Sequence, residues 1–510
     1  MSVDSPEVGR WVKVLDQTRC IGCHACSAAC KSENEVPLGV NRTYVKSVDV
    51  GEFPVARRAF QVTRCNQCTD APCVIACPTR AMYKRPDGIV DFDKSICIGC
   101  KACMAACPYD AIFINPEDHS AEKCNMCAHR LDVGLEPACV TVCPTEAILV
   151  GDLEDPSAKV TELIYRHPVV VRRPEKETAP GVFYLGAHQA TLDPLAARRP
   201  DGGLYAWATQ GPNDVQLVAA GHSAGPTSSA AALVSYDVPH RAPWGWRVSL
   251  YTWTKSVAAG LLMVAIALTL FGVNGWNDAL TRWVAPVGSL VFLAITGVLL
   301  TWDLKHPFRF YLIFTRHQWR SWLVRGGFML AGYGGILSVY LLAVIFGVGW
   351  LQRLSGIIAV PSAVVTAYYT AFLFAQAKAR DLWQSALLPI HLTLQSVLAG
   401  AAGLLPFSLA AGYAPHRTFV AITIVMAAAA VHMLLVWAEV ALPHVTAHAE
   451  LAIHEMVWGR FAPFFWVGIG GVAVAVAAPW IGWPVVPCVL IGLLAHEHAY
   501  VQAGQSVPLA

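Results

Sequence analysis

The stretch Cys20-Ile21-Gly22-Cys23-His24-Ala25-Cys26-Ser27-Ala28-Ala29-Cys30 carries four cysteines at the spacing C-x2-C-x2-C-x3-C. A tight loop of this kind binds three corners of a [4Fe–4S] cube, and a more remote cysteine closes the fourth. Three further groups of four cysteines follow before residue 144, so sixteen of the 17 cysteines lie in four motifs. The motifs are Cys20, Cys23, Cys26 and Cys30; Cys65, Cys68, Cys73 and Cys77; Cys97, Cys100, Cys103 and Cys107; and Cys124, Cys127, Cys139 and Cys143. Since each cube needs four thiolates, the pattern predicts four [4Fe–4S] clusters in a chain that conducts electrons.

Two other uses of cysteine fit this pattern less well. Zinc ribbons use paired C-x2-C knuckles, without triplets that end in C-x3-C-P. Here Pro78, Pro108 and Pro144 follow the last cysteine of three motifs. A disulfide framework needs an oxidising compartment and is usual in short secreted chains, and we expect no secretory signal peptide before Cys20. Iron–sulfur ligation is therefore the predicted role.

The spacing leaves open which motif supplies the fourth ligand of each cluster. In two-cluster ferredoxins the last cysteine of a motif ligates the other cluster, because the chain turns away after the triplet. Two pairings of the four motifs are then possible, and the spacing alone does not choose between them.

Residues 10–150 resemble the four-cluster electron-transfer subunits of the DMSO reductase, polysulfide reductase and nitrate reductase families. All four motifs match in order, including R-C-N-Q-C at 64–68, C-I-G-C-K-A-C at 97–103 and K-C-N-M-C at 123–127. The resemblance implies an α+β ferredoxin-like domain of two paired dicluster modules, with motif one paired with motif four and motif two with motif three. It also implies that cluster one faces a catalytic partner and that cluster four faces the membrane.

Carried over to this sequence, the resemblance implies four ligand sets. Cluster one takes Cys20, Cys23, Cys26 and Cys143, and cluster two takes Cys124, Cys127, Cys139 and Cys30. Cluster three takes Cys65, Cys68, Cys73 and Cys107, and cluster four takes Cys97, Cys100, Cys103 and Cys77. Lys31, and not a proline, follows Cys30; we expect this departure to leave ligation intact.

The rest of the chain is too apolar for an ordinary soluble protein. Overall 55% of residues are hydrophobic and 14% are charged, and the apolar excess lies after residue 247. Eight apolar stretches there are long enough to cross a bilayer, which takes about 20 residues each. They run near 248–273, 284–302, 327–348, 355–376, 385–408, 418–440, 462–483 and 485–503. The alternative, a large buried helical core, does not account for eight such stretches in succession, so we predict an all-α membrane domain of eight transmembrane helices.

These changes in composition predict three regions: a four-cluster domain over 1–155, a wrap and flexible linker over 156–246, and the membrane domain over 247–510. Within the middle region, Val182 to Leu185 could form a strand that packs on the ferredoxin domain. The run of small residues from Ala219 to Ala232 is typical of a flexible linker. The last two apolar stretches are joined only by Gly482, Trp483 and Pro484, at the end of the first stretch and before the second, which predicts a helical hairpin.

Loop charge predicts the orientation in the bacterial or archaeal cytoplasmic membrane. The loops on the ferredoxin side hold ten basic residues, and the opposite loops hold three. The ten are Arg241, Arg247, Lys305, Arg309, Arg316, Arg320, Arg325, Lys378, Arg380 and Arg460, and the three are Arg282, Arg353 and Arg417. The positive-inside rule therefore places the ferredoxin domain in the cytoplasm. The alternative is that the basic loop at 305–325, with five of the ten charges, serves only to dock that domain.

The membrane half resembles the NrfD/DmsC/PsrC group of quinone-reactive anchor subunits. The residues that carry the resemblance are W-D-L-K-H-P-F-R-F at 302–310, S-W-L at 321–323 and Y-V-Q-A-G-Q at 500–505. The resemblance implies a haem-free anchor that exchanges electrons with a membrane quinone, menaquinone or ubiquinone, near the cluster-bearing face.

Ionisable residues in the apolar stretches support a quinone site, because such residues are costly in a membrane and are usually functional. The candidates are Lys255, Asp303, His306, His391, His432 and Glu439. Quinone chemistry needs hydrogen-bond donors for two carbonyls and a proton acceptor, and these residue types supply both. Each also has a simpler interpretation: Lys255 could snorkel to the interface, and the others could pair within the bundle. His391 and His432 could alternatively be the axial ligands of a b-type haem.

No nucleotide loop, flavin fingerprint or nucleophile motif is evident, and no nucleic-acid partner is expected. The chain is thus predicted to be the electron-transfer and membrane-anchor subunit of a quinone-linked oxidoreductase, with substrate chemistry on another subunit. The resemblance implies a molybdenum or tungsten pterin enzyme as that partner, and a hydrogenase-type subunit is the alternative. Two other functions stay open: a redox-driven ion pump, and a ferredoxin whose helices are only an anchor.

Overall fold

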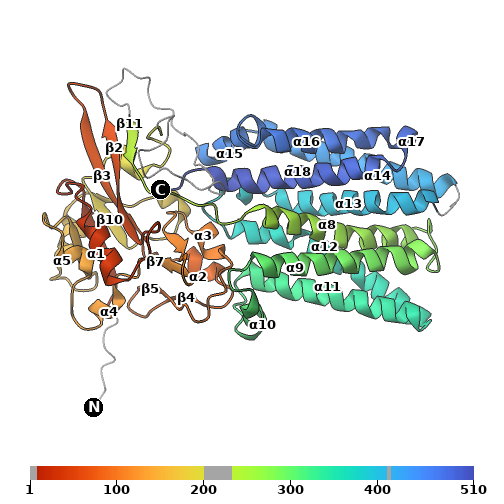
Figure 1. Ribbon diagram of the computed structural model, residues 1–510, viewed down its shortest axis with the longest axis horizontal. Coiled ribbons are helices and arrows are strands. Elements are labelled where there is room, and N and C mark those ends of the chain that lie inside the picture. Colours follow the sequence, from red (N-terminus) through yellow and green to blue (C-terminus); the bar gives the residue numbers. More distant parts are fainter. Residues whose placement is uncertain (1–8, 200–231, 411–414) are drawn as a thin grey trace, which may run out of the picture. The chain divides into compact units, whose positions relative to one another are not determined.

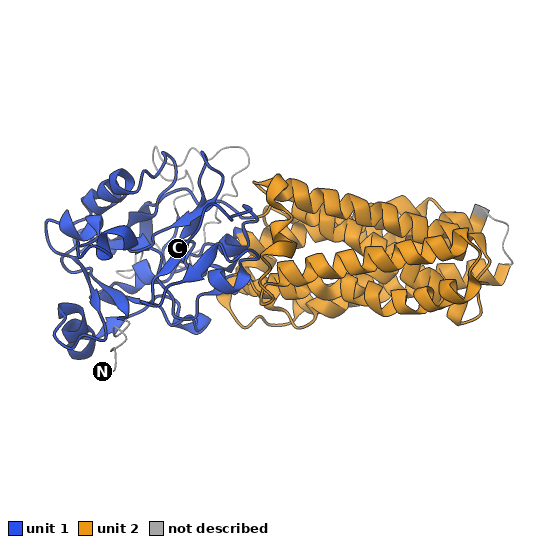
Figure 2. Cartoon of the chain, turned by 90° about the horizontal axis from the view of Figure 1, so that it is seen from below, with its two compact units in different colours: residues 1–243, 377–379, 506–510 blue, residues 244–376, 380–505 orange. Residues whose placement is uncertain are grey.

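The computed structural model describes residues 9–199, 232–410 and 415–510 and divides the chain into two units. Figure 2 colours them separately. Unit 1 comprises residues 1–243, 377–379 and 506–510, and unit 2 comprises residues 244–376 and 380–505. Each unit has its own buried core.

Unit 1 contains two larger sheets and two short hairpins (Figure 1). The first sheet has the spatial order β8 (Ile148–Asp152), β1 (Trp11–Asp16), β10 (Val182–Leu185) and β9 (Val169–Val170). The second has the order β11 (Ala232–Tyr236), β2 (Thr43–Val50) and β3 (Arg57–Arg64). The hairpins are β4 (Met82–Lys84) with β5 (Val90–Phe92), and β6 (Ile112–Ile114) with β7 (Ala121–Lys123). In the first sheet β1 runs parallel to β10 and antiparallel to β8.

Short helices in unit 1 carry five of the sixteen motif cysteines. They are α1 (Ala25–Glu33), α2 (Pro72–Ala76), α3 (Ala102–Ala106) and α5 (Ala138–Thr141), with α4 (Ala128–Leu131) between the last two. Helix α1 packs against α5, and α2 packs against α3. The first and fourth motifs therefore share one part of the unit, and the second and third share another. This α+β arrangement confirms the predicted ferredoxin-like fold class.

The region expected to be a wrap and linker contributes several elements to unit 1. They are α6 (Lys159–Arg166), β9, the 3-10 turn η1 (Pro174–Lys176), β10, α7 (Gln189–Leu192) and β11. The strand expected over Val182–Leu185 is β10, and its pairing with β1 makes it a central strand of the sheet. The small-residue run from Ala219 lies outside the described residues except for Ala232, where β11 begins.

Unit 2 is helical and lies in the range of the predicted membrane domain (Figure 1). Within the described residues, eight helices are long and apolar enough to cross a membrane, which confirms the predicted number. They are α8 (Trp246–Leu270), α9 (Ala285–Asp303) with the π-helical turn η2 (Leu280–Val284) before it, α11 (Trp322–Ile345), α12 (Gly349–Ala375), α13 (Leu388–Ala410), α14 (Pro415–Ala441), the segment α16 (Ala462–Ala473), η5 (Val474–Ala477) and α17 (Ala478–Ile481), and α18 (Val485–Ser506). Shorter helical pieces connect them: η3 (Pro307–Arg309), α10 (Leu312–Thr315), η4 (Asp381–Gln384) and α15 (Ala447–Val457).

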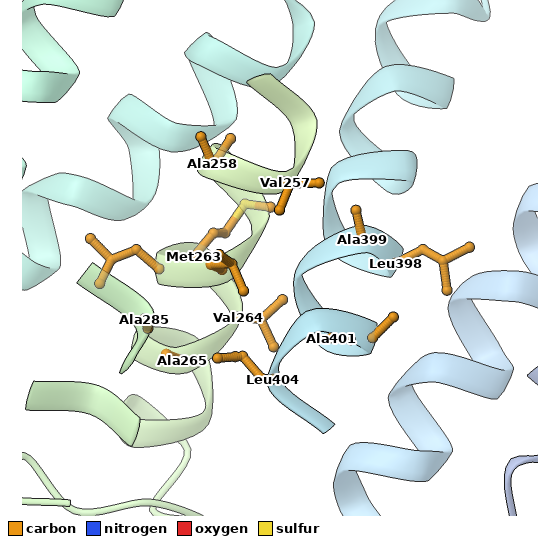
Figure 3. Close-up of a cluster of buried hydrophobic side chains, with 14 of the residues drawn as sticks. Val257, Ala258, Met263, Val264, Ala265, Ala285, Leu398, Ala399, Ala401 and Leu404 are labelled. Atoms are coloured by element: carbon orange, nitrogen blue, oxygen red, sulfur yellow. The ribbon is translucent and has the colours of Figure 1, made fainter. Parts of the chain in front are cut away.

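Helices α8 and α13 form the centre of unit 2, and small residues set their separation. Figure 3 shows Val257, Val264 and Leu404 among the apolar side chains between them. A Cβ atom added to Gly260 of α8 would lie 1.8 Å from the backbone oxygen of Ser396, and one added to Gly400 of α13 would lie 2.1 Å from the carbonyl carbon of Gly260. The two backbones therefore touch at a glycine pair, as is common where membrane helices approach closely.

Candidate electron-transfer and polar sites

The loops of the first and third motifs have the same backbone conformation. Gly22 and Gly99, each directly before the second cysteine of its motif, have φ of 70° and 66°. His24 and Lys101, each directly after that cysteine, have φ of 59° and 63° and precede α1 and α3. Left-handed residues on both sides of a cysteine turn the chain tightly around one point. The C-I-G-C sequence thus curls its thiols toward a shared centre.

The structure brings the predicted ligands of clusters one and four together around two hollows. We call the four predicted sets groups 1 to 4: Cys20, Cys23, Cys26 and Cys143; Cys30, Cys124, Cys127 and Cys139; Cys65, Cys68, Cys73 and Cys107; and Cys77, Cys97, Cys100 and Cys103. Group 1 lines a space of about 320 Å³, with Phe60 in the same apolar cluster. Group 4 lines a second space of about 370 Å³. Four thiols around one hollow are the donor set that a [4Fe–4S] cube requires.

In groups 2 and 3, too, the predicted ligands of each cluster lie close to one another. The thiol of Cys30 interacts electrostatically with Cys124, Cys127 and Cys139. In group 3 the thiols of Cys68 and Cys73 both interact with Cys65 and Cys107. Cys30 thus lies with the fourth motif, and Cys107 lies with the second motif.

Contacts between the groups give them a linear order. The thiols of Cys26 and Cys139 interact across groups 1 and 2, those of Cys65 and Cys124 across groups 2 and 3, and those of Cys73 and Cys103 across groups 3 and 4. Exposure follows the same order. All eight cysteines of groups 2 and 3 are buried, whereas group 1 contains the exposed Cys23 and group 4 the half-buried Cys100. The arrangement is a row of four centres with an accessible thiol at each end.

Buried cations lie beside group 2. Lys13 Nζ and Arg64 Nη1 donate hydrogen bonds to Cys139 Sγ at 3.7 and 3.2 Å, and both side chains are almost fully buried. Burial opposes ionisation of Cys139, but Lys13 and Arg64 outweigh it and lower the pKa of that thiol to about 7. At Cys26 and Cys30 burial is likewise the largest influence but is not outweighed, and it raises the pKa of Cys26 to about 11 and that of Cys30 to about 12. The protein therefore offsets negative charge more strongly at Cys139 than at these two thiols.

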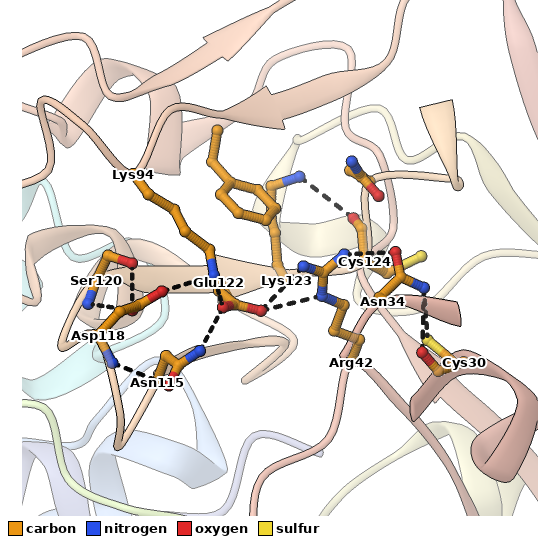
Figure 4. Close-up of polar contacts among 12 residues, drawn as sticks. Cys30, Asn34, Arg42, Lys94, Asn115, Asp118, Ser120, Glu122, Lys123 and Cys124 are labelled. Carbon is orange, nitrogen blue, oxygen red and sulfur yellow. Dashed lines mark hydrogen bonds and ion pairs between the residues drawn. The ribbon is translucent and has the colours of Figure 1, made fainter. Parts of the chain in front are cut away.

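A buried polar network joins group 2 to the β6–β7 hairpin (Figure 4). Asn34 Nδ2 lies 3.7 Å from both Cys30 Sγ and Cys127 Sγ. Arg42 donates to Asn34 Oδ1 at 2.8 Å and to Glu122 Oε2 at 2.9 Å, and Glu122 also pairs with Lys94. Each charge in this network has an opposite charge beside it, which is the condition for burying it without a large cost. The network fixes the amide donor of Asn34 against two sulfur atoms.

In unit 2 the structure places Lys255 in a buried polar group formed by four helices. Its ammonium donates to Ala367 O and Thr370 Oγ1 of α12, both at 2.7 Å. It also interacts electrostatically with Glu497 of α18, which accepts a hydrogen bond from Gln395 of α13. Lys255 is fully buried, so it does not snorkel to the membrane interface.

Asp303 and His306 lie at the end of α9. Asp303 is the last residue of that helix and His306 directly precedes η3, and both are half-buried. Asp303 interacts electrostatically with Tyr251 of α8, and Glu497 interacts with the same tyrosine. Because Tyr251 and Lys255 are four residues apart on one helix, they share a face. Asp303 is thereby associated with the Lys255 group.

His391, His432 and Glu439 form a second buried group, together with His496 of α18. The Nε2 atom of His391 lies 3.1 Å from Nδ1 of His432, and Nδ1 of His391 lies 3.9 Å from a carboxylate oxygen of Glu439. One nitrogen atom of each of the three histidines lies within 4.8 Å of the corresponding atoms of the other two. We call His391, His432 and His496 the histidine cluster. Since His391 and His432 contact each other directly, with ring centroids 4.7 Å apart, a haem macrocycle has no room between them in this arrangement.

Three residues of these groups were not predicted from the sequence: Gln395, His496 and Glu497. The signal for the last two was present, because His496 and Glu497 are ionisable residues inside the eighth apolar stretch. Gln395 carries no such signal, since an amide in a long apolar helix is distinguished only by what it contacts.

Comparison with known proteins matches both halves of the chain. Residues 56–153 match the family described as 4Fe-4S dicluster domain, and residues 235–487 match the family described as Polysulphide reductase, NrfD.

Several curated relatives match the iron–sulfur half. A tetrathionate reductase subunit of Salmonella typhimurium is 42% identical over 198 residues, which cover 37% of this chain and 77% of the relative. A polysulfide reductase chain of Wolinella succinogenes is 42% identical over 175 residues, covering 34% of this chain and 92% of the relative. The arsenate respiratory reductase iron-sulfur subunit ArrB of a Shewanella species is 37% identical over 220 residues, covering 34% and 94%. These relatives account for about a third of the chain, and the NrfD match accounts for much of the rest.

Proposed function

Because this protein belongs to the family of iron–sulfur subunits that includes those of tetrathionate reductase and polysulfide reductase, with an NrfD domain in the same polypeptide, we propose that it conducts electrons between the membrane quinone pool and a catalytic partner protein. The chain is an integral membrane protein and an iron–sulfur electron-transfer and anchor subunit. The ligand sets, the quinone site, the partner and the orientation are the parts that we propose.

Groups 1 to 4 each ligate one [4Fe–4S] cluster, with the ligand sets implied by the family resemblance. The observation that carries this part is the linear order of the groups, with buried thiols in the middle and an accessible thiol at each end. When bound, the clusters supply one-electron transfer steps. Hydrogen bonds and nearby charges tune cluster potentials, so Lys13, Arg64 and Asn34 favour the reduced state of cluster two.

The quinone headgroup is bound beside Lys255, Glu497 and Tyr251, with Asp303 and His306 at the nearby end of α9. Quinol oxidation releases two electrons and two protons. The Lys255 ammonium and the Tyr251 hydroxyl can donate hydrogen bonds to the two quinone oxygens, and the Glu497 carboxylate can accept the two protons one after the other, releasing the first before it takes the second. The burial of Lys255, which donates to Thr370, and of Glu497, which accepts from Gln395, supports this role, since ionisable residues inside membrane helices mark functional sites. His391, His432 and Glu439, also predicted from the sequence as quinone-site residues, belong to the second buried group.

The catalytic partner is a molybdenum or tungsten pterin enzyme that docks on unit 1, and unit 1 faces the cytoplasm. The named relatives are subunits of reductases, which supports a separate catalytic subunit. The excess of basic residues in the loops on one side of the membrane domain supports the orientation. The close contact of His391 with His432 supports a haem-free anchor.

Anaerobic redox-titrated EPR of the detergent-purified chain, with and without a menaquinol analogue, tests the proposal. Expected are signals from four [4Fe–4S] clusters, no haem Soret band, and cluster reduction that depends on added quinol. The Lys255→Met variant should slow quinol-dependent reduction about a hundredfold while dithionite still reduces all four clusters. Ser256→Ala is the matched control, because Ser256 is buried on the same helix and its hydroxyl donates to Thr252 O. Four clusters that ignore quinol in the wild-type chain would contradict the quinone site.

A further inference from the structure

We propose that the histidine cluster of unit 2 binds one divalent transition-metal ion, for which Zn²⁺ is the best-fitting probe. This inference goes beyond the proposed function and rests on the geometry of the three histidines alone. For His391 and His432 it replaces the predicted role as quinone-site residues, and it leaves the Lys255 site as proposed.

The three side chains already have the spacing of a metal-binding set. His391, His432 and His496 come from α13, α14 and α18, and one nitrogen of each lies within 4.8 Å of the others. His391 Nε2 and His432 Nδ1 share a hydrogen bond at 3.1 Å, and a bound ion would replace its proton. Zinc binds histidine nitrogen at about 2.0–2.1 Å in tetrahedral sites, which places two nitrogen ligands about 3.4 Å apart. Small side-chain rotations would bring the three nitrogens to that separation.

Unsatisfied nitrogen atoms in the histidine cluster call for a ligand. Nε2 of His432 and Nε2 of His496 are buried, and neither has a hydrogen-bond partner among the described residues. His391, His432 and His496 are exposed by 4%, 0% and 3%, so water does not reach these atoms from the surface. Buried polar atoms without partners are rare in native proteins and usually mark an absent ion or water. Three neutral imidazoles in one enclosed space present lone pairs that a metal ion would use.

Glu439 supplies the negative charge and the orientation that such a site needs. Its carboxylate lies 3.9 Å from Nδ1 of His391, the nitrogen opposite the one that faces the cluster. Metal-binding histidines commonly donate their second ring N–H to a carboxylate, which fixes the ring and raises its basicity. Tyr500 of α18 is a further neighbour of the Glu439 carboxylate, and its hydroxyl donates to Leu382 O at 3.0 Å. One carboxylate beside the cluster offsets part of the ion's charge within the membrane domain.

The donor set selects among metals. Three imidazoles without a thiolate suit zinc, copper, nickel and iron better than magnesium or calcium, which prefer oxygen. The three ligands come from three different helices and lie around a common centre, which fits the tetrahedral preference of zinc better than the planar preference of copper(II). A bound ion would tie α13, α14 and α18 together at one point.

Elemental analysis of the full-length purified protein tests the site. The wild-type protein is incubated with micromolar Zn²⁺, freed of loosely bound metal by gel filtration, and analysed for zinc and iron. Expected is about one zinc per polypeptide in addition to the iron of the clusters. His432→Ala and His496→Ala should each lower zinc at least tenfold with iron unchanged. The matched control is His498→Ala: His498 lies two residues further along α18 and its ring contacts Phe464 at 4.6 Å, so zinc should stay at the wild-type level.

X-ray absorption at the zinc edge of the wild-type protein gives a second test that needs no variant. The proposal predicts three nitrogen scatterers at about 2.0–2.1 Å and no sulfur. Sulfur scatterers would show zinc in the cysteine motifs and would overturn the proposal. A wild-type protein that retains no zinc, or zinc that persists in both histidine variants, would overturn it as well.

Discussion

Unit 1 and unit 2 build their polar sites in opposite ways. In unit 1 each cysteine group takes most of its members from one short motif, and its local backbone turns gather them, as Gly22 and His24 do around Cys23. In unit 2 each of the two polar groups draws its residues from several helices: Lys255 comes from α8, His391 from α13, and His496 from α18. A site made by a local turn survives small shifts of the fold, whereas a site made between helices exists only when the helices are packed correctly.

The largest effect is expected from removing one cluster ligand, and it should stay confined to one cysteine group. Cys103→Ser should abolish electron transfer to and from group 4 and remove about a quarter of the iron, because a cube needs four thiolates. Cys103 lines the group 4 hollow and is buried. The measurement is iron content with quantitative EPR. Cys488→Ser is the control, since Cys488 is exposed on α18 outside every motif; an equal iron loss there would refute a local effect.

A change at the glycine contact between α8 and α13 should destabilise unit 2, and with it the polar groups that form between its helices. Gly260→Leu should destabilise unit 2 by about 3 kcal/mol or more, because the glycine backbone touches Gly400 and no side chain fits between them. Tryptophan fluorescence during thermal unfolding in detergent measures this effect. Gly297→Leu on α9, where an added Cβ meets no heavy atom within 4 Å, should leave the midpoint nearly unchanged. Equal loss of stability in both variants would show that the effect does not come from the contact between Gly260 and Gly400.

Unit 1 also contains a polar site whose residues are far apart in the sequence. Its contribution to stability should depend on pH. His240 lies 2.5 Å from Asp110 and 3.1 Å from Asp237. Burial alone would lower the pKa of His240, but Asp237 and Asp110 outweigh it and raise the pKa to about 9. A raised pKa contributes stability that is complete below the ordinary value of 6.5 and is lost as pH rises through about 9, by roughly 3 kcal/mol in all.

Hydrogen exchange of the 232–240 segment, corrected for intrinsic rates, should therefore show protection that falls between about pH 7 and pH 10. His240→Gln should remove that dependence and leave the segment weakly protected throughout. A wild-type profile without pH dependence would contradict the charged state assigned to His240.

The smallest predicted effect comes from a substitution in unit 1 that removes a charge beside a cluster and leaves the ligands of that cluster in place. Arg64→Gln should leave all four clusters in place and lower the potential of cluster two, because a buried positive charge beside Cys139 is lost. A charge several ångströms away contributes about 2 kcal/mol, on the order of 100 mV for one electron. Redox-titrated EPR measures the shift. Arg58→Gln is the control, because Arg58 lies on the same strand but is exposed and paired with Asp49.

The two units also differ in what their sequences reveal. Cysteine spacing predicts the motifs of unit 1, and apolar length predicts eight helices in unit 2, because both signals are local. The strand over Val182–Leu185 was recognisable by composition, but its central place beside β1 depends on pairing between distant segments. The contact of His391 with His432 could not be predicted, since it depends on how α13 and α14 rotate against each other. His496 and Glu497 could be predicted as functional candidates, because they are ionisable residues inside an apolar stretch. They were not predicted because the eighth stretch was recognised by its length alone.

The pairing of β1 with β8 and β10 has a consequence for synthesis of the protein. The first motif follows β1 directly, but neither partner strand exists until residues 148–185 have left the ribosome. At the usual rate of translation this wait is on the order of ten seconds. During that time the thiols of Cys20, Cys23 and Cys26 have no folded domain around them and are open to oxygen and to the wrong metal. The cell therefore gains from delivering iron and sulfide to this protein late, after the sheet has closed.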